Sequence, residues 1–388
     1  RDMVDQAQAI NERAALPDLE FGSLKDFFRD LEERKDDLSR WAGELYLERH
    51  RGTYTSQAKT KRNNRKLEFA LRKAEIWAST AFLADSEFEY PKDSLETAWK
   101  TLLFNQFHDI LPGSSIREVY EDADRDYGKS IEKVESTLDA ALAELSGPDD
   151  SMEQFMVYNS LPWRMDRIVE LEKPESLQGD ELVLIDEAGD RTPGQISGID
   201  EDRLVFRADS LPPLGGRSFE VVEQQEDASN ELEITEETME NSAIKIEFGD
   251  GGNIVSIRDK EAGRQVLSGK GNRFVLYRDL PTEYDAWELE GDIYEVGDEL
   301  SAPQEVKVIE SGPVRATLRT RIEFGRSEMV QDISLYPDSK RIDFRTRVDW
   351  HEKNSLLKVH FPVNVRTETA KYEVQYGHHE RPTHSNTG

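Results

Sequence analysis

Residues 67–82 read Leu-Glu-Phe-Ala-Leu-Arg-Lys-Ala-Glu-Ile-Trp-Ala-Ser-Thr-Ala-Phe, and their apolar side chains recur at steps of three and four. This spacing places one set of residues on a single helical face: Leu67, Ala70, Leu71, Ala74, Trp77, Ala78, Ala81 and Phe82. The stretch therefore predicts a long amphipathic helix that buries this face.

Two more helices are predicted after it. One begins after Pro91, with Asp93 or Ser94 as its cap, and its expected core face comprises Leu95, Ala98, Trp99, Leu102, Leu103 and Phe107. The other follows Pro112-Gly113-Ser114-Ser115 and continues the three-and-four spacing from Ile116 to Leu142. Ser115 and Glu118 have the spacing of a capping box at its start. Three such helices joined by short turns predict an antiparallel bundle over residues 61–147.

From Phe155 onward the period of the apolar residues changes from helical spacing to two. Short runs typical of strands are separated by Gly, Pro, Asn and Asp: 155–158, 182–185, 204–206, 219–222, 244–248, 314–318, 342–348 and 357–361. Gly147-Pro148-Asp149-Asp150 is a plausible linker before them. We expect large β-sandwich domains over residues 153–388.

Residues 1–60 have a mixed pattern. Leu24–Leu31 reads as a charged helix, and Gly43–Leu47 reads as a strand followed by a polar loop. The segment is too short to form a domain alone, so we expect the tail of a larger α/β catalytic domain. The whole is then a multidomain α+β protein. Because the chain begins at Arg1 rather than Met, we expect a fragment or a processed chain.

Composition limits the function. The 388 residues include 80 acidic and 50 basic side chains, a formal net charge of -30, which argues against a nucleic-acid partner. The absence of Cys excludes disulfides and thiolate metal sites. No apolar run approaches the roughly 20 residues of a membrane-spanning helix, and no signal peptide opens the chain. We expect a halophilic source and a cytoplasmic location by default, although an ordinary acidic protein is the alternative.

The most informative polar cluster is Asn105-Gln106-Phe107-His108-Asp109. It lies at the end of the second predicted helix, away from the apolar face. One interpretation is a C-terminal helix turn in which His108 interacts with the helix dipole. The other is a metal ligand, but one His supplies too few donors for zinc, which takes three or four from protein. The residues alone therefore indicate half of a site.

A second candidate is the run from His50 to Gln57, which holds two cationic residues, an aromatic residue and three hydroxyls. It could bind a polyhydroxylated ligand, or it could be an ordinary loop before a helix. No Gly-rich phosphate loop, His-Glu-x-x-His motif or serine elbow is present.

Several stretches together resemble the α-mannosidases of glycoside hydrolase family 38. Residues 105–115, Asn-Gln-Phe-His-Asp-Ile-Leu-Pro-Gly-Ser-Ser, resemble a motif of that family's helix bundle, and residues 43–57 resemble the end of its catalytic domain. The stretches 157–163, 279–287, 349–362 and 380–384 resemble its β domains. The resemblance covers nearly the whole chain in the right order.

The resemblance implies a retaining exo-α-mannosidase that acts on mannose-containing carbohydrates through an Asp nucleophile and a zinc ion. His108 matches a zinc ligand, and Asp109 matches a residue that hydrogen-bonds the sugar. It also implies substrate-binding positions at His50, Arg51 and Tyr54, and a β-domain loop with Asp285 and Trp287 at the same pocket, although Trp287 could instead be a core residue.

The same resemblance implies what this sequence lacks. The family's His-x-Asp pair, a further Asp ligand and the nucleophile have no match here, so no catalytic residue is assigned within the chain. We expect the chain alone to bind zinc weakly and to be inactive. A homo-oligomer is compatible with the sequence. The alternative from another functional class is a non-catalytic carbohydrate-binding or scaffold module.

Overall fold

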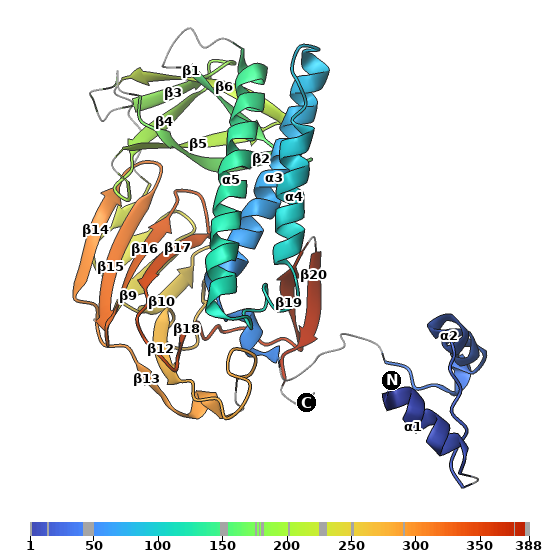
Figure 1. The fold of residues 1–388 in the computed structure, drawn as a ribbon. Coiled ribbons are helices and arrows are strands. Elements are labelled where there is room, and N and C mark those ends of the chain that lie inside the picture. Colours follow the sequence, from blue (N-terminus) through green and yellow to red (C-terminus); the bar gives the residue numbers. More distant parts are fainter. Residues whose placement is uncertain are drawn as a thin grey trace. The chain divides into compact units, whose positions relative to one another are not determined.

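The computed structural model describes residues 2–13, 15–41, 50–147, 154–174, 177, 179, 182–200, 202–224, 231–249, 252–289, 292–375 and 377–384. The chain divides into two compact units, Arg1–Glu48 and Arg49–Gly388. All α-helices in the described part precede residue 147, and all strands follow residue 153 (Figure 1). The fold is therefore mixed α+β, as the change of period predicted.

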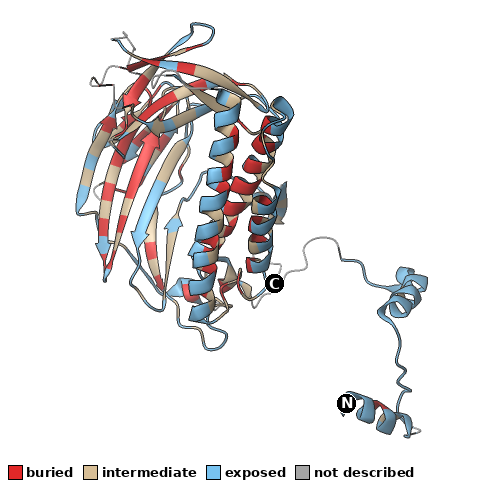
Figure 2. Cartoon of the chain, turned by 45° about the horizontal axis from the view of Figure 1, so that its top comes forward, coloured by how far each residue is buried: buried red, intermediate tan, exposed pale blue. Residues whose placement is uncertain are grey.

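The first unit contains two short helices, α1 (Asp2–Asn11) and α2 (Leu24–Glu33), and the 3₁₀ turn η1 (Lys35–Asp37). The helix expected at residues 24–31 is thus present. Its first turn is capped by Ser23, whose hydroxyl accepts a hydrogen bond from the Asp26 N–H at 3.1 Å. Both helices are almost wholly exposed (Figure 2). The strand expected at residues 43–47 lies outside the described residues.

Three long helices open the second unit: α3 (Ala58–Ala84), α4 (Lys92–Asn105) and α5 (Arg117–Ser146). In Figure 1 they lie side by side, with α4 running opposite to α3 and α5. Figure 2 shows buried residues on the faces that they turn toward one another. The residues of this shared core are Leu67, Ala70, Leu71, Ala74, Leu95, Ala98, Leu102, Ile110, Ala123, Tyr127 and Val134. The three-and-four spacing thus identified most of the buried residues of the three helices, but Phe82 and Ile116, which were also expected on these faces, are 50% and 68% exposed.

Two predicted core residues near the end of α4 are exposed. Leu103 is 60% exposed and Phe107 is 53% exposed. The buried stripe of α4 runs through Leu95, Ala98, Leu102 and Asn105, so Leu103 is turned about 100° away from it. Phe107 is exposed because the helix ends at Asn105 and the helical period ends with it.

The predicted helix caps were also wrong. The N-cap of α4 is Pro91, and neither Asp93 nor Ser94 caps it. The N-cap of α5 is Ile116, without a side-chain cap. Ser115 does not form a capping box, because its hydroxyl donates to the Asp109 carbonyl at 2.7 Å instead. The serine closes the loop before the helix rather than the helix itself.

A six-stranded antiparallel sheet follows the helices, in the order β1-β6-β3-β4-β5-β2. Its strands are β1 (Gln154–Asn159), β2 (Met165–Glu172), β3 (Leu182–Asp186), β4 (Arg191–Ile196), β5 (Arg203–Leu211) and β6 (Gly215–Glu223). Phe206 and Phe219 pack edge to face in its core, with ring centroids 5.0 Å apart. Four of these strands, β1, β3, β5 and β6, lie where alternation predicted them, whereas β2 and β4 were not predicted.

Two further sheets pack face to face. One has the order β11-β10-β9-β8-β7 and the other β14-β15-β16-β17. The strands are β7 (Glu233–Ile234), β8 (Thr238–Glu240), β9 (Ile244–Phe248), β10 (Ile254–Asp259), β11 (Arg264–Gln265), β14 (Glu305–Ser311), β15 (Ala316–Phe324), β16 (Ser327–Leu335) and β17 (Ile342–Asp349). Ile246 and Ile254 share one buried cluster with Leu318 and Ile333. This is sandwich packing of two sheets.

The remaining strands form two smaller sheets. β12 (Arg273–Arg278) pairs with β13 (Gly297–Glu299) and β18 (Ser355–His360), and β19 (Thr369–Val374) pairs with β20 (Gly377–Pro382). The 3₁₀ turn η4 (Ile293–Glu295) precedes β13. Residues 279–289, between β12 and η4, form a long loop that reaches the helices, as described next. No helix in the described part of the chain is long and apolar enough to span a membrane.

Candidate functional site

The loop between α4 and α5 carries the cluster singled out in the sequence, but its four polar residues point in different directions. The amide of Asn105 is buried and donates to the Thr101 carbonyl at 2.9 Å. The amide of Gln106 donates to Asn64 at 3.1 Å and to the Glu68 carboxylate at 3.2 Å. Gln106 thus holds the end of α4 against α3, whereas Asn105 bonds within α4 itself.

His108 and Asp109 face solvent. Their side chains are 78% and 44% exposed, and His108 Nε2 lies 3.4 Å from Asp109 Oδ2. His108 stands beyond the end of α4, so it is not part of the last helical turn. The Asp109 backbone is fixed, because its carbonyl accepts hydrogen bonds from Ser115 Oγ at 2.7 Å and from the Tyr120 hydroxyl at 3.2 Å. The backbone therefore holds the pair at the surface, where His108 Nε2 and Asp109 Oδ2 are accessible to a metal or a ligand.

The second candidate segment, residues 50–57, is folded on itself around the 3₁₀ turn η3 (Gly52–Tyr54). Thr53 Oγ1 donates to the His50 carbonyl at 2.6 Å. Arg51 and Tyr54 are exposed, and Tyr54 is 62% exposed. His50 is half-buried. Arg51 and Tyr54 are thus at the surface, whereas His50 turns toward another part of the chain.

That other part is the loop 279–289. The His50 ring stacks on Trp287, with ring centroids 5.0 Å apart and an interplanar angle of 26°. The Gly52 N–H donates to the Trp287 carbonyl at 2.7 Å, and Ser56 Oγ donates to the Ala286 carbonyl at 2.7 Å. A Cβ on Gly52 would lie 3.0 Å from the Trp287 carbonyl carbon, so glycine allows this approach. The structure therefore brings His50 and Trp287 together.

The loop 279–289 is built with strained backbone. Tyr284 and Ala286 have φ values of +54° and +69°, a backbone conformation that residues other than glycine rarely adopt. Tyr284 stacks on Trp287 with ring centroids 5.9 Å apart. Asp285, between the strained residues, is exposed, and its Oδ1 accepts from the Ala286 N–H at 3.1 Å. Strain of this kind persists where surrounding contacts enforce it and is common at binding sites.

Lys61, on the first turn of α3, links the segment before α3 to the loop between α4 and α5. Its Nζ donates to the Ser56 carbonyl at 2.5 Å and to the Leu111 carbonyl at 2.8 Å. Burial lowers the pKa of Lys61 to about 8. Residues 50–57, 106–115 and 279–289 are therefore linked through shared contacts, and we call these three segments the loop cluster. Its central segment is 50–57, which contacts both of the others.

Two buried polar atoms of the loop cluster have no hydrogen-bond partner among the described residues. They are His50 Nδ1 and Asp279 Oδ1. Burial, together with the charge of Asp285, raises the pKa of Asp279. Sequence reasoning missed Asp279 and Lys61 as members of the cluster. No local signal distinguishes them, because carboxylates and lysines are abundant and these two act through distant contacts.

The donor set for a metal is incomplete. His108 Nε2 and Asp109 Oδ2 are the two adjacent donors on the exposed loop. Within the described residues, no group of three or more His, Cys, Asp or Glu side chains could hold a metal ion. Tetrahedral zinc needs four ligands. The chain thus offers part of a zinc site, and among the described residues no contact joins His108 to His50 or Trp287.

Two family profiles match the chain. Residues 48–145 match the alpha mannosidase middle domain, and residues 239–388 match the glycosyl hydrolases family 38 C-terminal domain. The first match covers η3 and the three helices, and the second covers the later sheets. The chain therefore belongs to glycoside hydrolase family 38 and carries its middle and C-terminal domains.

Similar proteins agree with this assignment. The chain is 32% identical over 389 residues to alpha-mannosidase 2C1 of Homo sapiens, across 99% of this chain and 36% of that protein. It is 30% identical over 426 residues to alpha-mannosidase G of Dictyostelium discoideum, across 99% of this chain and 38% of that protein. The chain thus spans about a third of the length of these curated relatives. The crystal structure of an alpha-mannosidase from Enterococcus faecalis V583 has the same fold, with a TM-score of 0.78 at 20% identity, over 99% of this chain and 52% of that one.

Proposed function

We propose that the complete protein is a retaining, zinc-dependent exo-α-mannosidase, which hydrolyses terminal α-linked mannose from oligosaccharides or mannosides. The observation that carries this proposal is the match of both the helical and the C-terminal β segments to family 38 domains, in the same order. The relatives named alpha-mannosidases over 99% of the chain support it. The proposed binding partner of the complete protein is a mannose-containing carbohydrate. Its acidic surface disfavours nucleic acid as a partner.

Three structural regions are proposed within the chain. Residues 1–60 are the tail of an α/β barrel-like catalytic domain, residues 61–147 are a three-helix bundle, and residues 153–388 are β-sandwich domains. The shared core of α3, α4 and α5 and the sandwich packing of the later sheets support the second and third regions.

His108 is the proposed zinc ligand. Its exposed ring and fixed loop suit a metal that is completed by donors from a catalytic domain preceding this chain. Zinc would orient hydroxyls of the terminal mannose as a template. Asp109, beside His108, would accept a hydrogen bond from the sugar, and its carboxylate already accepts one from Ser114 Oγ at 3.3 Å.

His50, Arg51, Tyr54, Asp285 and Trp287 are the proposed rim of the sugar pocket. The stack of His50 on Trp287 supports one shared rim, because it fixes a β-domain loop against the segment that precedes the helices. Trp287 is half-buried and stacks on His50 and Tyr284, and Tyr54, the last residue of η3, is exposed. The two unpartnered atoms, His50 Nδ1 and Asp279 Oδ1, are buried near this rim.

Catalysis requires groups that this chain does not supply. A retaining glycosidase uses two carboxyl groups about 5–5.5 Å apart, one of them as nucleophile. We propose that the nucleophile and three zinc ligands belong to the preceding catalytic domain, so the 388-residue chain alone is inactive.

An activity assay on an aryl α-mannoside tests this proposal. The complete protein should turn over the substrate in a zinc-dependent way, and the chain alone should not, whatever zinc is supplied. Turnover by the purified chain would contradict the missing-domain proposal. An inactive complete protein that still binds mannosides would favour the alternative, a non-catalytic carbohydrate-binding module.

A further inference from the structure

A cavity of about 350 Å³ lies between the six-stranded sheet and the turn that joins β16 to β17. One wall comes from β2 and β5, through Asp166, Arg167, Ile168, Glu170 and Arg207. The other wall comes from Arg315 and from residues 336–343. None of these residues belongs to the loop cluster, so the cavity is a separate feature of the chain.

The lining is charged but balanced. It includes four arginines, Arg167, Arg207, Arg315 and Arg341, and four acidic residues, Asp166, Glu170, Asp338 and Asp343. Their formal charges sum to zero, in a chain whose net charge is -30. Small-molecule sites are usually lined by apolar side chains with a few polar groups. This cavity instead suits a ligand that is polar throughout and uncharged.

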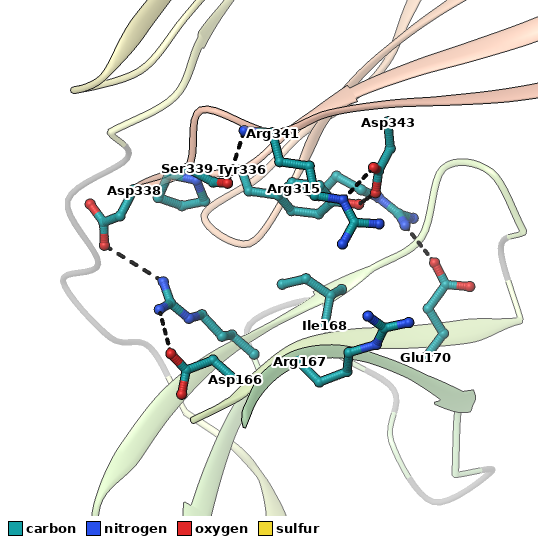
Figure 3. A pocket seen from close by; sticks show the side chains of 12 residues that line it. Asp166, Arg167, Ile168, Glu170, Arg315, Tyr336, Asp338, Ser339, Arg341 and Asp343 are labelled. Carbon is teal, nitrogen blue, oxygen red and sulfur yellow. Dashed lines mark hydrogen bonds and ion pairs between the residues drawn. The ribbon is translucent and has the colours of Figure 1, made fainter. Parts of the chain in front are cut away.

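Two of the arginines have unused donors directed into the cavity. Arg167 is exposed, and its side chain forms no hydrogen bond or ion pair with any residue that the structure describes. Arg341 uses its Nε to bind Asp343 Oδ1 at 2.5 Å. Its two terminal nitrogens have no partner in the described part of the chain. Figure 3 shows these two guanidinium groups reaching into the same space from opposite walls.

Two of the carboxylates have unused acceptors. Asp166 Oδ2 and Asp338 Oδ2 each lie 3.7 Å from the Arg207 guanidinium, which is an ion-pair distance but too long for a hydrogen bond. The other oxygen of Asp166 accepts from the Ser210 N–H at 2.7 Å, so the carboxylate is held in place. The cavity therefore offers donors from Arg167 and Arg341 and acceptors from Asp166 and Asp338.

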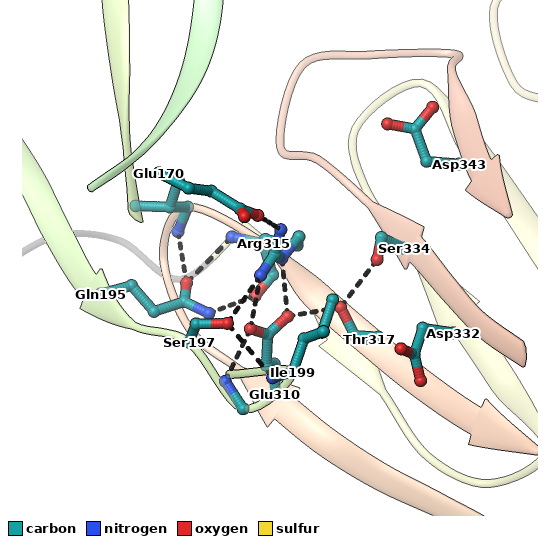
Figure 4. A network of polar contacts seen from close by, with 12 residues as sticks. Glu170, Gln195, Ser197, Ile199, Glu310, Arg315, Thr317, Asp332, Ser334 and Asp343 are labelled. Carbon is teal, nitrogen blue, oxygen red and sulfur yellow. Dashed lines mark hydrogen bonds and ion pairs between the residues drawn. The ribbon is translucent and has the colours of Figure 1, made fainter. Parts of the chain in front are cut away.

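Part of the lining is fixed before any ligand arrives. The Arg315 side chain is 4% exposed and binds Glu310 at 2.7 Å and Glu170 at 2.5 Å (Figure 4). On the same wall, the Tyr336 hydroxyl donates to Asp343 Oδ2 at 2.8 Å. Side chains that are already ordered lose little conformational entropy on binding.

We propose that this cavity is a non-catalytic binding site for a neutral oligosaccharide. Each sugar hydroxyl both donates and accepts a hydrogen bond, and planar guanidinium and carboxylate groups can each engage two neighbouring hydroxyls. A phosphate or another anion would use the two arginines, but it would also meet the Asp166 and Asp338 carboxylates, whose two charges share the single guanidinium of Arg207. The choice of a mannose oligosaccharide as the ligand rests on the proposed function.

Calorimetric titration of the 388-residue chain with α-mannotriose tests the site, with inorganic phosphate as a second titrant. We expect millimolar binding of the trisaccharide. Arg167→Ala should weaken it about tenfold, because hydrogen bonds from a charged group are lost. Arg258→Ala is the matched control, since Arg258 is also an exposed strand arginine without a partner among the described residues. It should bind like the unaltered chain, and melting curves should show that both variants are folded.

Three results would overturn the proposal. The first is no binding of the trisaccharide at millimolar concentrations. The second is binding of phosphate, but not of the trisaccharide, that depends on Arg167. The third is trisaccharide binding that His108→Ala abolishes and Arg167→Ala leaves intact, which would place the ligand at the loop cluster and leave the proposed function standing. If maltotriose binds as well as mannotriose and needs Arg167, the site is confirmed and only the choice of mannose fails.

Discussion

Gly113 lies so close to Ser56 that a Cβ on the glycine would be 2.6 Å from the Ser56 carbonyl oxygen. The glycine also has a φ of +96°, a conformation that L-residues with a side chain rarely adopt. Gly113 lies in the loop that carries His108, and Ser56 lies in the segment that carries His50. This contact fixes the spacing between two candidate parts of the site.

Replacing Gly113 with alanine should therefore lower the free energy of unfolding by about 2–4 kcal/mol, from backbone strain and overpacking. Gly128→Ala is the control, because Gly128 lies within α5 and a Cβ there meets no atom within 4 Å. The control should raise stability by about 0.5–1 kcal/mol, as alanine favours the helix. Urea denaturation measures both. Equal stability of the two variants would show that the Gly113–Ser56 contact is not tight.

The lowered pKa of Lys61 predicts how the free energy of unfolding should change with pH. Its pKa is about 8 in the folded chain and 10.5 ordinarily. Between these values the unfolded chain holds a proton that the folded chain has released, so stability due to this group should rise with pH over that range. Below pH 8 both states are protonated, and its contribution should be constant. Because Lys61 is only half-buried, solvent reduces the size of the effect.

The measurement is the difference in unfolding free energy between the chain and Lys61→Met at several pH values. Lys59→Met controls for the loss of one lysine, since Lys59 pairs with Asp124 from an exposed position. A difference that falls as the pH rises from 8 toward 10.5 would contradict the buried environment of Lys61.

The long helices and several of the strands could be predicted from the sequence because their signals are local, whereas strands such as β2, β10 and β16 were missed. The apolar residues of 67–82 follow one period, and Leu67, Leu71 and Ala74 are fully buried. Errors arose where tertiary contacts override local preference. The Ser115 hydroxyl could have capped a helix, but it closes the loop at Asp109 instead.

The candidate site was harder to predict, because its contacts join distant segments. The expectation that Trp287 reaches the segment at His50 came from resemblance to a family rather than from any pattern around either residue. The contacts of Lys61 with Ser56 and Leu111 leave no trace in the sequence near it. The same holds for the cavity between β2 and the β16–β17 turn, whose walls are separated by more than a hundred residues.

Arg315 predicts a large stability effect at the junction of two sheets. Its guanidinium binds Glu310, whose side chain is 1% exposed, and also contacts Ser197 Oγ at 3.1 Å. Arg315→Ala leaves a buried carboxylate without its partner, and we expect a loss of about 3–5 kcal/mol. Arg117→Ala, which removes an exposed pair with Glu121, should cost less than about 1 kcal/mol.

The double variant Arg315→Met, Glu310→Leu separates charge from packing. It should recover much of the lost stability, since apolar replacements of a buried pair are often neutral or stabilising. A double variant that is no more stable than Arg315→Ala would show that the uncompensated charge of Glu310 is not the cause.

The net charge of -30 predicts that stability rises with salt. The Debye length falls from about 10 Å at 0.1 M to about 3 Å at 1 M, so repulsion between surface carboxylates weakens. The melting temperature should climb with sodium chloride beyond physiological concentrations if the source is a halophile. An equal concentration of sucrose separates screening from general strengthening of apolar burial. A flat response to chloride would remove the halophile hypothesis.

A second exposed His–Asp pair in the chain can serve as a control for the proposed zinc ligand. His108 lies 3.4 Å from Asp109, and His351 lies 3.0 Å from Asp349; both are exposed His–Asp pairs. Only His108 is proposed to bind zinc. The two histidines therefore differ in proposed role, although each is exposed and lies next to an aspartate.

The most direct measurement is the zinc content and zinc affinity of the complete protein with His108→Ala, compared with His351→Ala. Removing a ligand should weaken zinc binding by more than the roughly 10- to 100-fold typical of residues that only orient ligands, and α-mannosidase turnover should fall with it. His351→Ala should keep both. Normal zinc content and turnover in the His108→Ala protein would contradict the assignment of His108 as a metal ligand.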